Sequence, residues 1–442
     1  MKKNVVFFLC VVMIFSACSM KDNNTIPGTV DVCNFDSTST IKIPNDINKY
    51  PIGLYSNIFS NVDYVALEYT DKSIVSTITK MAITNNNDLL IFDFQNKAVL
   101  LFDSTGKFKN KIGVLGRAQN EYIEPLDMVY DEIHNQVIVY DNAKKTLMYY
   151  NTEGKYLKSI SLNEYIESFE VLDDSHLVLY YDYKGSEDNN INYNFKIIDT
   201  KGNIIKELAP YDKSMIYVTM GPAPFHKFNG NLFCHIERTP VVNEITLKGM
   251  KPKYVFDLGT YQLPNDYYMH GYETFCEKVL SLEQNKATIL KFYQTDKSVI
   301  TTLACRGNSP EMFSKLMIIR DSVCSHPEYY ITLINDLYGK QSLGPSDLCH
   351  VFKNKAFFVC DPSFISSLSE FPSNTDVSSK IAKRYRDIAK ESANDMKTIY
   401  NNIADVFEQS TFSLTITDKE KGFIDSLKKA NNPIIQICTF KK

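Results

Sequence analysis

Arg117, Glu121, Tyr122 and Asp127 lie close together in the sequence and carry side chains that suit ligand recognition. A guanidinium, two carboxylates and a phenol can form directed hydrogen bonds with a carboxylate or with sugar hydroxyls. We therefore interpret these four as candidate ligand-binding residues. The alternative is that Arg117 and Glu121 pair with each other and fix a connection between two units of the fold.

Recognisable catalytic motifs are absent from the sequence. The seven histidines form no metal-binding spacing, and there is neither a G-x-S-x-G motif nor a phosphate-binding glycine loop. His226 and His235 could face a channel, but we interpret them as hydrogen-bonded strand residues. Asp93, Asp141 and Asp361 follow predicted strands, which favours turn caps over a ring of carboxylates around a cation. The sequence therefore predicts no catalytic residue, no metal and no cofactor.

The composition is that of a globular protein. Of the 442 residues, 44% are hydrophobic and 23% are charged, which excludes disorder as the main state. The formal net charge is −4, whereas general nucleic-acid binders carry a basic excess, so we expect no nucleic-acid partner. Abundant Tyr and Phe favour strands.

One hairpin motif repeats along the chain. An apolar strand, a turn that begins with Asp or Asn and contains Gly, and a second strand occur at residues 101–108, 149–156 and 197–204, with a weaker copy at 244–250. The glycines are 48, 48 and 47 residues apart. Asp or Asn caps such a turn, and Gly adopts the positive φ that closes it.

A period of this length with four short strands is typical of a β-propeller blade, because a single sheet must stack on its neighbours to bury both faces. We predict an all-β, six-bladed β-propeller over residues 61–442, with Asn61–Tyr69 pairing with the last blade to close the ring. Helical insertions are expected in the later blades, near residues 308–340 and 376–409. The expected blades are 72–113, 121–162, 165–211, 215–259, 272–304 and 343–440.

Several residues at the first blade junction carry a family resemblance. The segments are Gly106-Lys107-Phe108, Ile112-Gly113, Gly116-Arg117, Glu121-Tyr122 and Pro125-Leu126-Asp127. They resemble the first blade junction of bacterial six-bladed β-propeller lipoproteins, an NHL-like and mostly uncharacterised family. Residues 118–120 differ from the G-P-G of that family, so we expect a different turn there. The resemblance implies fold and location rather than activity.

The amino terminus has the pattern of a lipoprotein signal. Basic residues precede an apolar run that is too short to span a bilayer, and small residues then lead to Cys18. We predict a signal peptide at residues 1–17, lipidation of Cys18 and a flexible tether over residues 18–60, with an ordinary signal peptide as the alternative. Lys21-Asp22 favours the outer membrane, at its surface or its periplasmic face. Cysteines further along the chain are expected to be mainly free and buried.

Two functions from different classes follow from these patterns. The favoured hypothesis is a noncatalytic cell-envelope lipoprotein whose propeller face binds a glycan, peptide or protein partner, since Tyr-rich loops supply rigid contact area. The alternative is an envelope hydrolase or lyase with a channel-bound metal, so enzymatic activity is left open. The membrane is the expected partner through Cys18.

Overall fold

The structure is a computed structural model. It describes residues 40–43, 51–185, 189, 191–212, 224–236, 239–262, 286–296, 298–306, 312–319, 328–337, 342–343, 347–362, 365, 368–392, 394–409, 413–427 and 431–441. The predicted signal peptide, Cys18 and residues 18–39 of the predicted tether lie outside this part of the chain.

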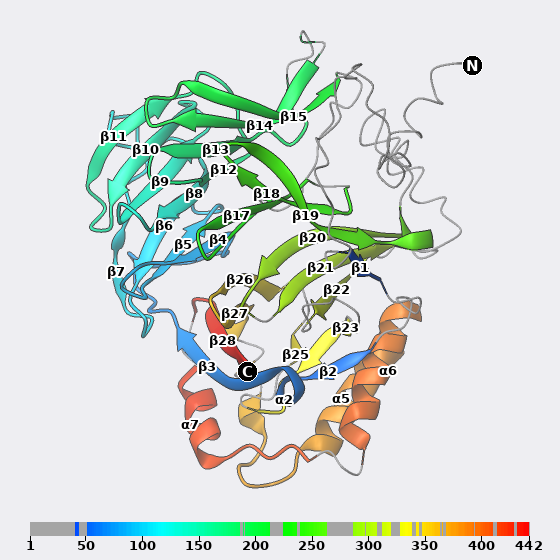
Figure 1. Cartoon of the computed structure of the whole chain (residues 1–442). Coiled ribbons are helices and arrows are strands. Elements are labelled where there is room, and N and C mark those ends of the chain that lie inside the picture. The colour runs from blue at the N-terminus through cyan, green and yellow to red at the C-terminus, as the bar shows by residue number, and fades with distance from the viewer. Residues whose placement is uncertain are drawn as a thin grey trace.

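Antiparallel sheets follow one another around a central channel, which confirms an all-β propeller (Figure 1). In the described residues, five sheets have the expected four strands. Their strands are β4 (Lys80–Ile83), β5 (Leu89–Asp93), β6 (Ala98–Phe102) and β7 (Phe108–Lys111); β8 (Pro125–Asp131), β9 (Gln136–Asp141), β10 (Thr146–Asn151) and β11 (Tyr156–Ser161); β12 (Ser168–Val171), β13 (His176–Tyr180), β14 (Ile191–Asp199) and β15 (Ile204–Asp212); β20 (Lys286–Gln294), β21 (Val299–Arg306), β22 (Met312–Ile319) and β23 (Glu328–Tyr330); and β26 (Leu348–Phe352), β27 (Lys355–Cys360), β28 (Ile434–Phe440) and β3 (Phe59–Ala66).

The remaining large sheet has five strands and is not a regular four-stranded blade, so the prediction of six regular blades is wrong. It contains β16 (Phe225–Phe228), β17 (Asn231–His235), β18 (Val241–Thr246) and β19 (Gly249–Asp257), and a fifth strand, β1 (Thr40–Lys42). Strand β1 pairs in parallel with the outer strand β19, so it comes from outside the repeat. The described chain therefore has five regular four-stranded blades rather than six, together with this enlarged five-stranded sheet.

Residues that we expected in the flexible tether form part of the fold. In addition to β1, they include β2 (Ile52–Leu54), the short helix α2 (Tyr55–Ile58) and the start of β3. Strand β2 pairs in parallel with β24 (Thr332–Ile334), which also pairs with β25 (Ser342–Leu343). The amino-terminal segment thus contacts two sheets before it enters the ring.

The prediction of a helical insertion near residues 308–340 is wrong. Residues 312–319 form β22, which pairs with β21 over its whole length and with β23 on its other side. Helix propensity is a weak preference, and pairing on both edges overrides it here.

Ring closure occurs as predicted. Strand β3 pairs antiparallel with the carboxy-terminal strand β28, from Ala66 opposite Ile434 to Phe59 opposite Phe440. Figure 1 shows these two ends of the chain side by side in blue and red. Pairing between the ends removes two open sheet edges.

Hydrophobic clusters lie between neighbouring sheets. The first two sheets, for example, enclose Leu90, Val99, Met128 and Val139, each of which is fully buried. Similar clusters join each sheet to the next around the ring. Each sheet therefore buries both faces, which is the physical reason for the repeat.

The repeated glycines form the predicted hairpins. Gly106 and Gly154 have φ angles of 89° and 83°. Asp103 caps the first turn, because its Oδ1 accepts hydrogen bonds from the amides of Thr105 at 2.8 Å and Lys107 at 3.0 Å. A Cβ atom on Gly154 would lie 2.2 Å from the backbone oxygen of Lys111, so glycine is also required there by close packing.

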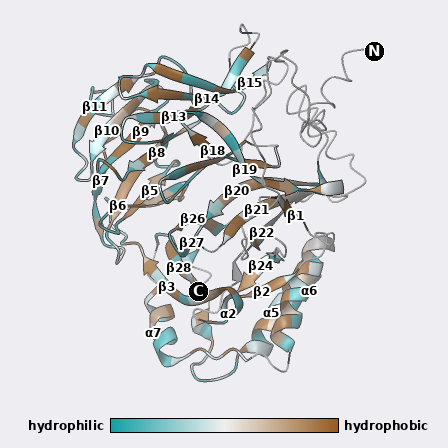
Figure 2. Cartoon of the chain, viewed as in Figure 1, coloured by the Kyte–Doolittle hydropathy of each residue, from teal (hydrophilic) through white to brown (hydrophobic). Residues whose placement is uncertain are grey.

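Helices fill the connection between β27 and β28, as predicted for residues 376–409. They are α5 (Ser378–Glu391) and α6 (Asn394–Glu408), followed beyond the predicted range by α7 (Asp418–Ser426). The single turn η6 (Leu368–Glu370) precedes α5 in the same connection, and the single turn η3 (Gly259–Tyr261) follows β19. Hydrophobic and hydrophilic residues alternate along α5 and α6 (Figure 2), and the apolar faces pack beside the last sheet. Within the described part of the chain, none of the helices has the length and hydrophobicity of a membrane span.

Candidate functional site in the propeller channel

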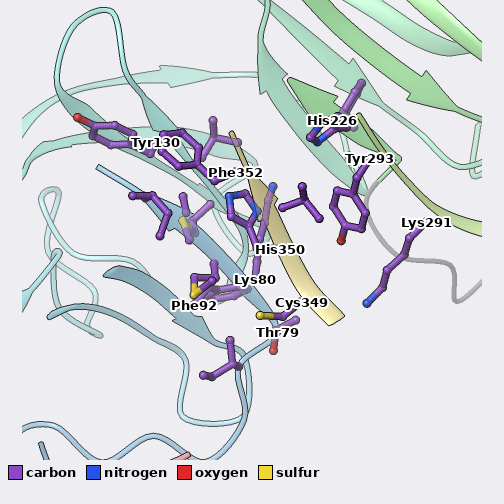
Figure 3. Close-up of a pocket in the computed structure, with 18 of the residues that line it drawn as sticks. Thr79, Lys80, Phe92, Tyr130, His226, Lys291, Tyr293, Cys349, His350 and Phe352 are labelled. Atoms are coloured by element: carbon purple, nitrogen blue, oxygen red, sulfur yellow. The ribbon is translucent and has the colours of Figure 1, made fainter. Parts of the chain in front are cut away.

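A cavity of about 1190 Å³ occupies the channel. It is lined by residues of β4, β8, β12, β16, β20 and β26, the first strand of each sheet in the ring. These strands are short and several carry single polar residues among apolar ones, so the repeat itself brings polar side chains from distant parts of the sequence to one place. Figure 3 draws 18 of the lining residues around this space and labels ten of them.

Asp127 organises one side of the cavity. Its Oδ1 accepts hydrogen bonds from the ammonium of Lys80 at 2.9 Å and from the Met128 amide at 2.8 Å. Its Oδ2 accepts from the Ser168 hydroxyl at 2.8 Å and from the Phe169 amide at 3.2 Å. The side chain is 7% exposed. Asp127 therefore joins three neighbouring sheets, and its hydrogen-bonding capacity is largely used by the protein.

Glu170 lies two residues beyond Ser168 on β12 and also lines the cavity. Its Oε1 accepts a hydrogen bond from the Val171 amide at 3.0 Å. Burial raises the pKa of Glu170, although the positive charges of Lys80 and Lys227 act in the opposite direction. In the described residues, no ion pair within salt-bridge distance is formed by this carboxyl group.

Two histidines line the cavity on other strands. The His226 ring donates to the backbone oxygen of Gln294 at 3.0 Å, and burial lowers the pKa of His226 to about 4. Burial, together with the nearby His226 and Lys80, lowers the pKa of His350 to about 3. Both rings are neutral at neutral pH, so each has one nitrogen that donates and one that accepts. The described residues provide no hydrogen-bond partner for His350, which lies near the centre of Figure 3.

Lys291 and Tyr293 project from β20 into the same part of the cavity (Figure 3). The Lys291 ammonium donates to the backbone oxygen of Leu348 at 2.8 Å. Burial lowers the pKa of Lys291, and the nearby Cys349 and Asp347 offset part of this effect. Burial also raises the pKa of the Tyr293 hydroxyl. This side of the cavity therefore presents hydrogen-bond donors.

The sequence-predicted site residues are not gathered in one place. Asp127 lines the cavity, whereas Tyr122 is buried and its hydroxyl donates to the Ile112 oxygen at 3.2 Å. Burial raises the pKa of Tyr122 to about 12. Glu121 accepts from the Ala118 amide at 3.0 Å, and Arg117 is exposed. No ion pair joins Arg117 to Glu121 in this described loop. A ligand-binding role for these four residues stays a prediction.

The remaining candidates behave as expected. His235 donates to the Thr239 oxygen at 3.0 Å, as a hydrogen-bonded strand histidine. Asp93 accepts from the Asn96 amide at 3.1 Å, and Asp141 accepts from the amides of Ala143 at 3.0 Å and Lys144 at 3.4 Å, so these two cap the turns that follow their strands. The cysteines whose side chains are described form no disulfide; they are Cys234, Cys349, Cys360 and Cys438.

The described residues contain no group of three or more His, Cys, Asp or Glu side chains placed to hold a metal ion. Sequence reasoning missed Lys80, Glu170, Lys291 and His350, because they lie on four strands that are far apart in the sequence. One signal was present: Lys80 and Asp127 are 47 residues apart, which is the length of the repeat. Matching positions in successive repeats can therefore be expected to meet at the channel.

The fold and this cavity define a β-propeller with a polar channel site. The chain belongs to the family described as a domain of unknown function, DUF4934, whose profile matches residues 38–439. The NHL-like resemblance stays a prediction. No curated protein matches the chain in sequence.

Two solved structures resemble this fold. The first is a Bacteroides fragilis protein described as a candidate exported protein, with a TM-score of 0.60 at 16% identity; the match covers 91% of this chain and 99% of that one. The second is a member of the DUF4221 family from Bacteroides vulgatus, with a TM-score of 0.48 at 9% identity; it covers 87% of this chain and 97% of that one. The first likeness supports the fold.

Proposed function

We propose that this chain is an exported, lipid-anchored protein of the cell envelope that binds a ligand in its propeller channel without catalysing a reaction. The observation that carries the proposal is the cavity of about 1190 Å³ with polar groups from several sheets on its wall. Small-molecule sites usually enclose roughly 300–1,000 Å³ and combine apolar walls with a few convergent polar groups. The channel therefore suits a small molecule, or the end of a peptide or glycan, better than a flat protein surface.

The chemistry of the cavity supports binding rather than catalysis. Cys349 and Cys360 line the cavity. Burial raises the pKa of Cys349 to about 12, which disfavours the reactive thiolate. Its Sγ lies 3.2 Å from the Phe357 oxygen and donates to it. Ser168 donates to Asp127 rather than to a histidine. The alternative of a channel metal has no suitable set of ligands in the described residues.

The envelope location is supported by the amino-terminal signal and by the relative described as exported. Two acyl chains on Cys18 would be enough for a stable membrane anchor. We expect radiolabelled palmitate to be incorporated into the wild-type chain, and we expect the labelled chain to fractionate with the outer membrane. A Cys18→Ala variant should lose the label. Equal labelling of both chains would contradict lipidation at this residue.

The binding test uses the absence of tryptophan from the chain. Phe352→Trp places one indole in the cavity, where the Phe352 ring lies 6.4 Å from that of His350 (Figure 3). Leu157→Trp is the control, because Leu157 is 48% exposed on the outer strand β11. The probes are trialanine, maltose and galacturonate at millimolar concentration.

We expect at least one probe to change the emission of the indole at position 352 and to leave that at position 157 unchanged. The same probe should raise the melting temperature of the wild-type protein, since a ligand that binds the folded state stabilises it. If no probe changes either quantity, or if both indoles respond equally, the channel is not the binding site.

A further inference from the structure

We infer that the ligand of the channel is a short peptide whose ammonium binds Glu170 and whose carboxylate binds Lys291 and His350. This inference rests on the proposed function, because it names the class of ligand for the same cavity. Two observations support it. Some charged groups on the wall already have a partner within the protein, and the remaining ones lie on opposite sides of the ring.

Three carboxylates that line one side of the cavity already pair with lysines of the protein. Asp127 binds Lys80 at 2.9 Å. Glu132 lies 3.3 Å from the Lys227 ammonium. Glu167 pairs with Lys184, outside the cavity lining, at 2.5 Å.

Glu170 differs from these residues. The positive charges of Lys80 and Lys227 act on the Glu170 carboxyl group, yet each of these lysines forms its ion pair with another carboxylate. The hydrogen bond from the Val171 amide occupies Oε1. A carboxylate can accept several hydrogen bonds, so Oε2 has capacity for a donor from outside the protein. An ammonium group supplies both that donor and the compensating charge.

The opposite side of the cavity presents donors. Lys291 donates one hydrogen bond, to the Leu348 oxygen, and an ammonium has three hydrogens to donate. In the described part of the chain, no ion pair joins Lys291 to a carboxylate, although the nearby Asp347 offsets part of the lowering of the Lys291 pKa. His350 and Tyr293 add an imidazole N–H and a hydroxyl to this side, and all three residues line the cavity. A carboxylate is the group that accepts from several such donors at once.

The order of the sheets places these two sides across the channel. Glu170 is on β12 and His350 is on β26. The sheets containing β8 and β4 lie between them in one direction, and those containing β16 and β20 in the other. The Lys291 ammonium reaches the start of β26, so it belongs to the same side as His350. A ligand that uses both sides must carry opposite charges at separated positions, as a short peptide does.

Isothermal titration calorimetry with trialanine, N-acetyl-trialanine and trialanine amide tests this inference. The capped peptides each lack one of the two charges. We expect wild-type protein to bind trialanine about tenfold or more tightly than either capped peptide, the effect of losing one charge-assisted hydrogen bond. Equal affinity for all three peptides would overturn the inference without any variant being needed.

Two substitutions locate the charges. In Glu170→Gln the preference for a free amino end should disappear while the preference for a free carboxylate remains, and Lys291→Met should have the reverse effect. Glu167→Gln is the control, because Glu167 already has a protein partner, and both preferences should persist. If Glu170→Gln and Lys291→Met discriminate between the peptides as the wild type does, these residues do not hold the two ends.

The outcome also separates this inference from the proposed function. If maltose or galacturonate changes the emission of the Phe352→Trp indole and trialanine neither does so nor gives heat, the channel binds a ligand that is not a peptide. The proposed function then stands and the peptide inference is wrong. If no probe binds, both are wrong.

Discussion

Replacing Asp127 by alanine removes the shared acceptor of four hydrogen bonds at the wall of the channel. The donors are the Lys80 ammonium, the Ser168 hydroxyl and the amides of Met128 and Phe169, at 2.8–3.2 Å. The side chain of Asp127 is 7% exposed and that of Lys80 is 24% exposed. The substitution therefore leaves one partly buried charge and three polar groups without their acceptor.

The expected loss in the free energy of unfolding is about 3–5 kcal/mol, the range for breaking a buried ion pair by removing one partner. Water entering the cavity can solvate Lys80, which argues for the lower end of that range. Asp127→Asn keeps one acceptor oxygen and should cost roughly half as much. Ser168→Ala removes a single hydrogen bond and should cost about 1 kcal/mol.

Urea unfolding followed by circular dichroism measures these differences through the midpoint and the slope. The double variant Lys80→Met, Asp127→Ala removes the unpaired charge, so it should recover part of the loss caused by Asp127→Ala alone. If Asp127→Ala costs less than about 1 kcal/mol, or if Lys80→Met adds to the loss, the carboxylate does not stabilise this junction as described.

Three further changes test other parts of the structure by urea unfolding. Gly154→Ala should destabilise by about 2–4 kcal/mol through strain and collision, whereas Gly230→Ala, also at positive φ but with open space around it, should cost about 1 kcal/mol; equal losses would contradict the packing. His226 has a lowered pKa of about 4, so its stabilising effect is complete above pH 6.5 and is lost as the pH falls towards 4. Between pH 7.5 and 5 the wild-type protein should lose about 2 kcal/mol of its free energy of unfolding through His226, and a His226→Gln variant should lose about 2 kcal/mol less than the wild type over the same range. The same pH dependence in both proteins would refute the assignment. Thr417→Ala removes the hydroxyl that accepts from the Glu420 amide at the start of α7 and should lower the free energy of unfolding by about 1 kcal/mol. An unchanged free energy of unfolding would show that this cap does not stabilise the helix.

Local turn chemistry made much of the fold predictable. The glycines at positions 106 and 154 and the Asp and Asn residues before them determine a hairpin within a few residues, so the repeat and the propeller could be inferred. The strand at residues 312–319 could not, because its pairing with β21 and β23 decides its structure. Strand β1 was missed for a similar reason: a three-residue segment in a polar stretch becomes a strand through the edge that it meets.

The candidate site was less predictable than the fold. Asp127 was singled out for its place in a connection, and it lines the channel. Glu170, Lys291 and His350 were not, because their proximity depends on the closure of the ring and not on spacing in the sequence. In a propeller, the polar residues of the first strand of each sheet are the positions to compare.

The pairing of β1 with β19 has a mechanical consequence. Ile41 at the centre of β1 is fully buried, and the strand is fixed by its pairing from Thr40 opposite Val255 to Lys42 opposite Asp257. A force applied to the amino-terminal end of the chain therefore acts first on the β1–β19 pair and then on the β2–β24 pair. The seam between β3 and β28 lies further along the chain, so a force applied at the amino-terminal end must separate both of these strand pairs before it can open the ring.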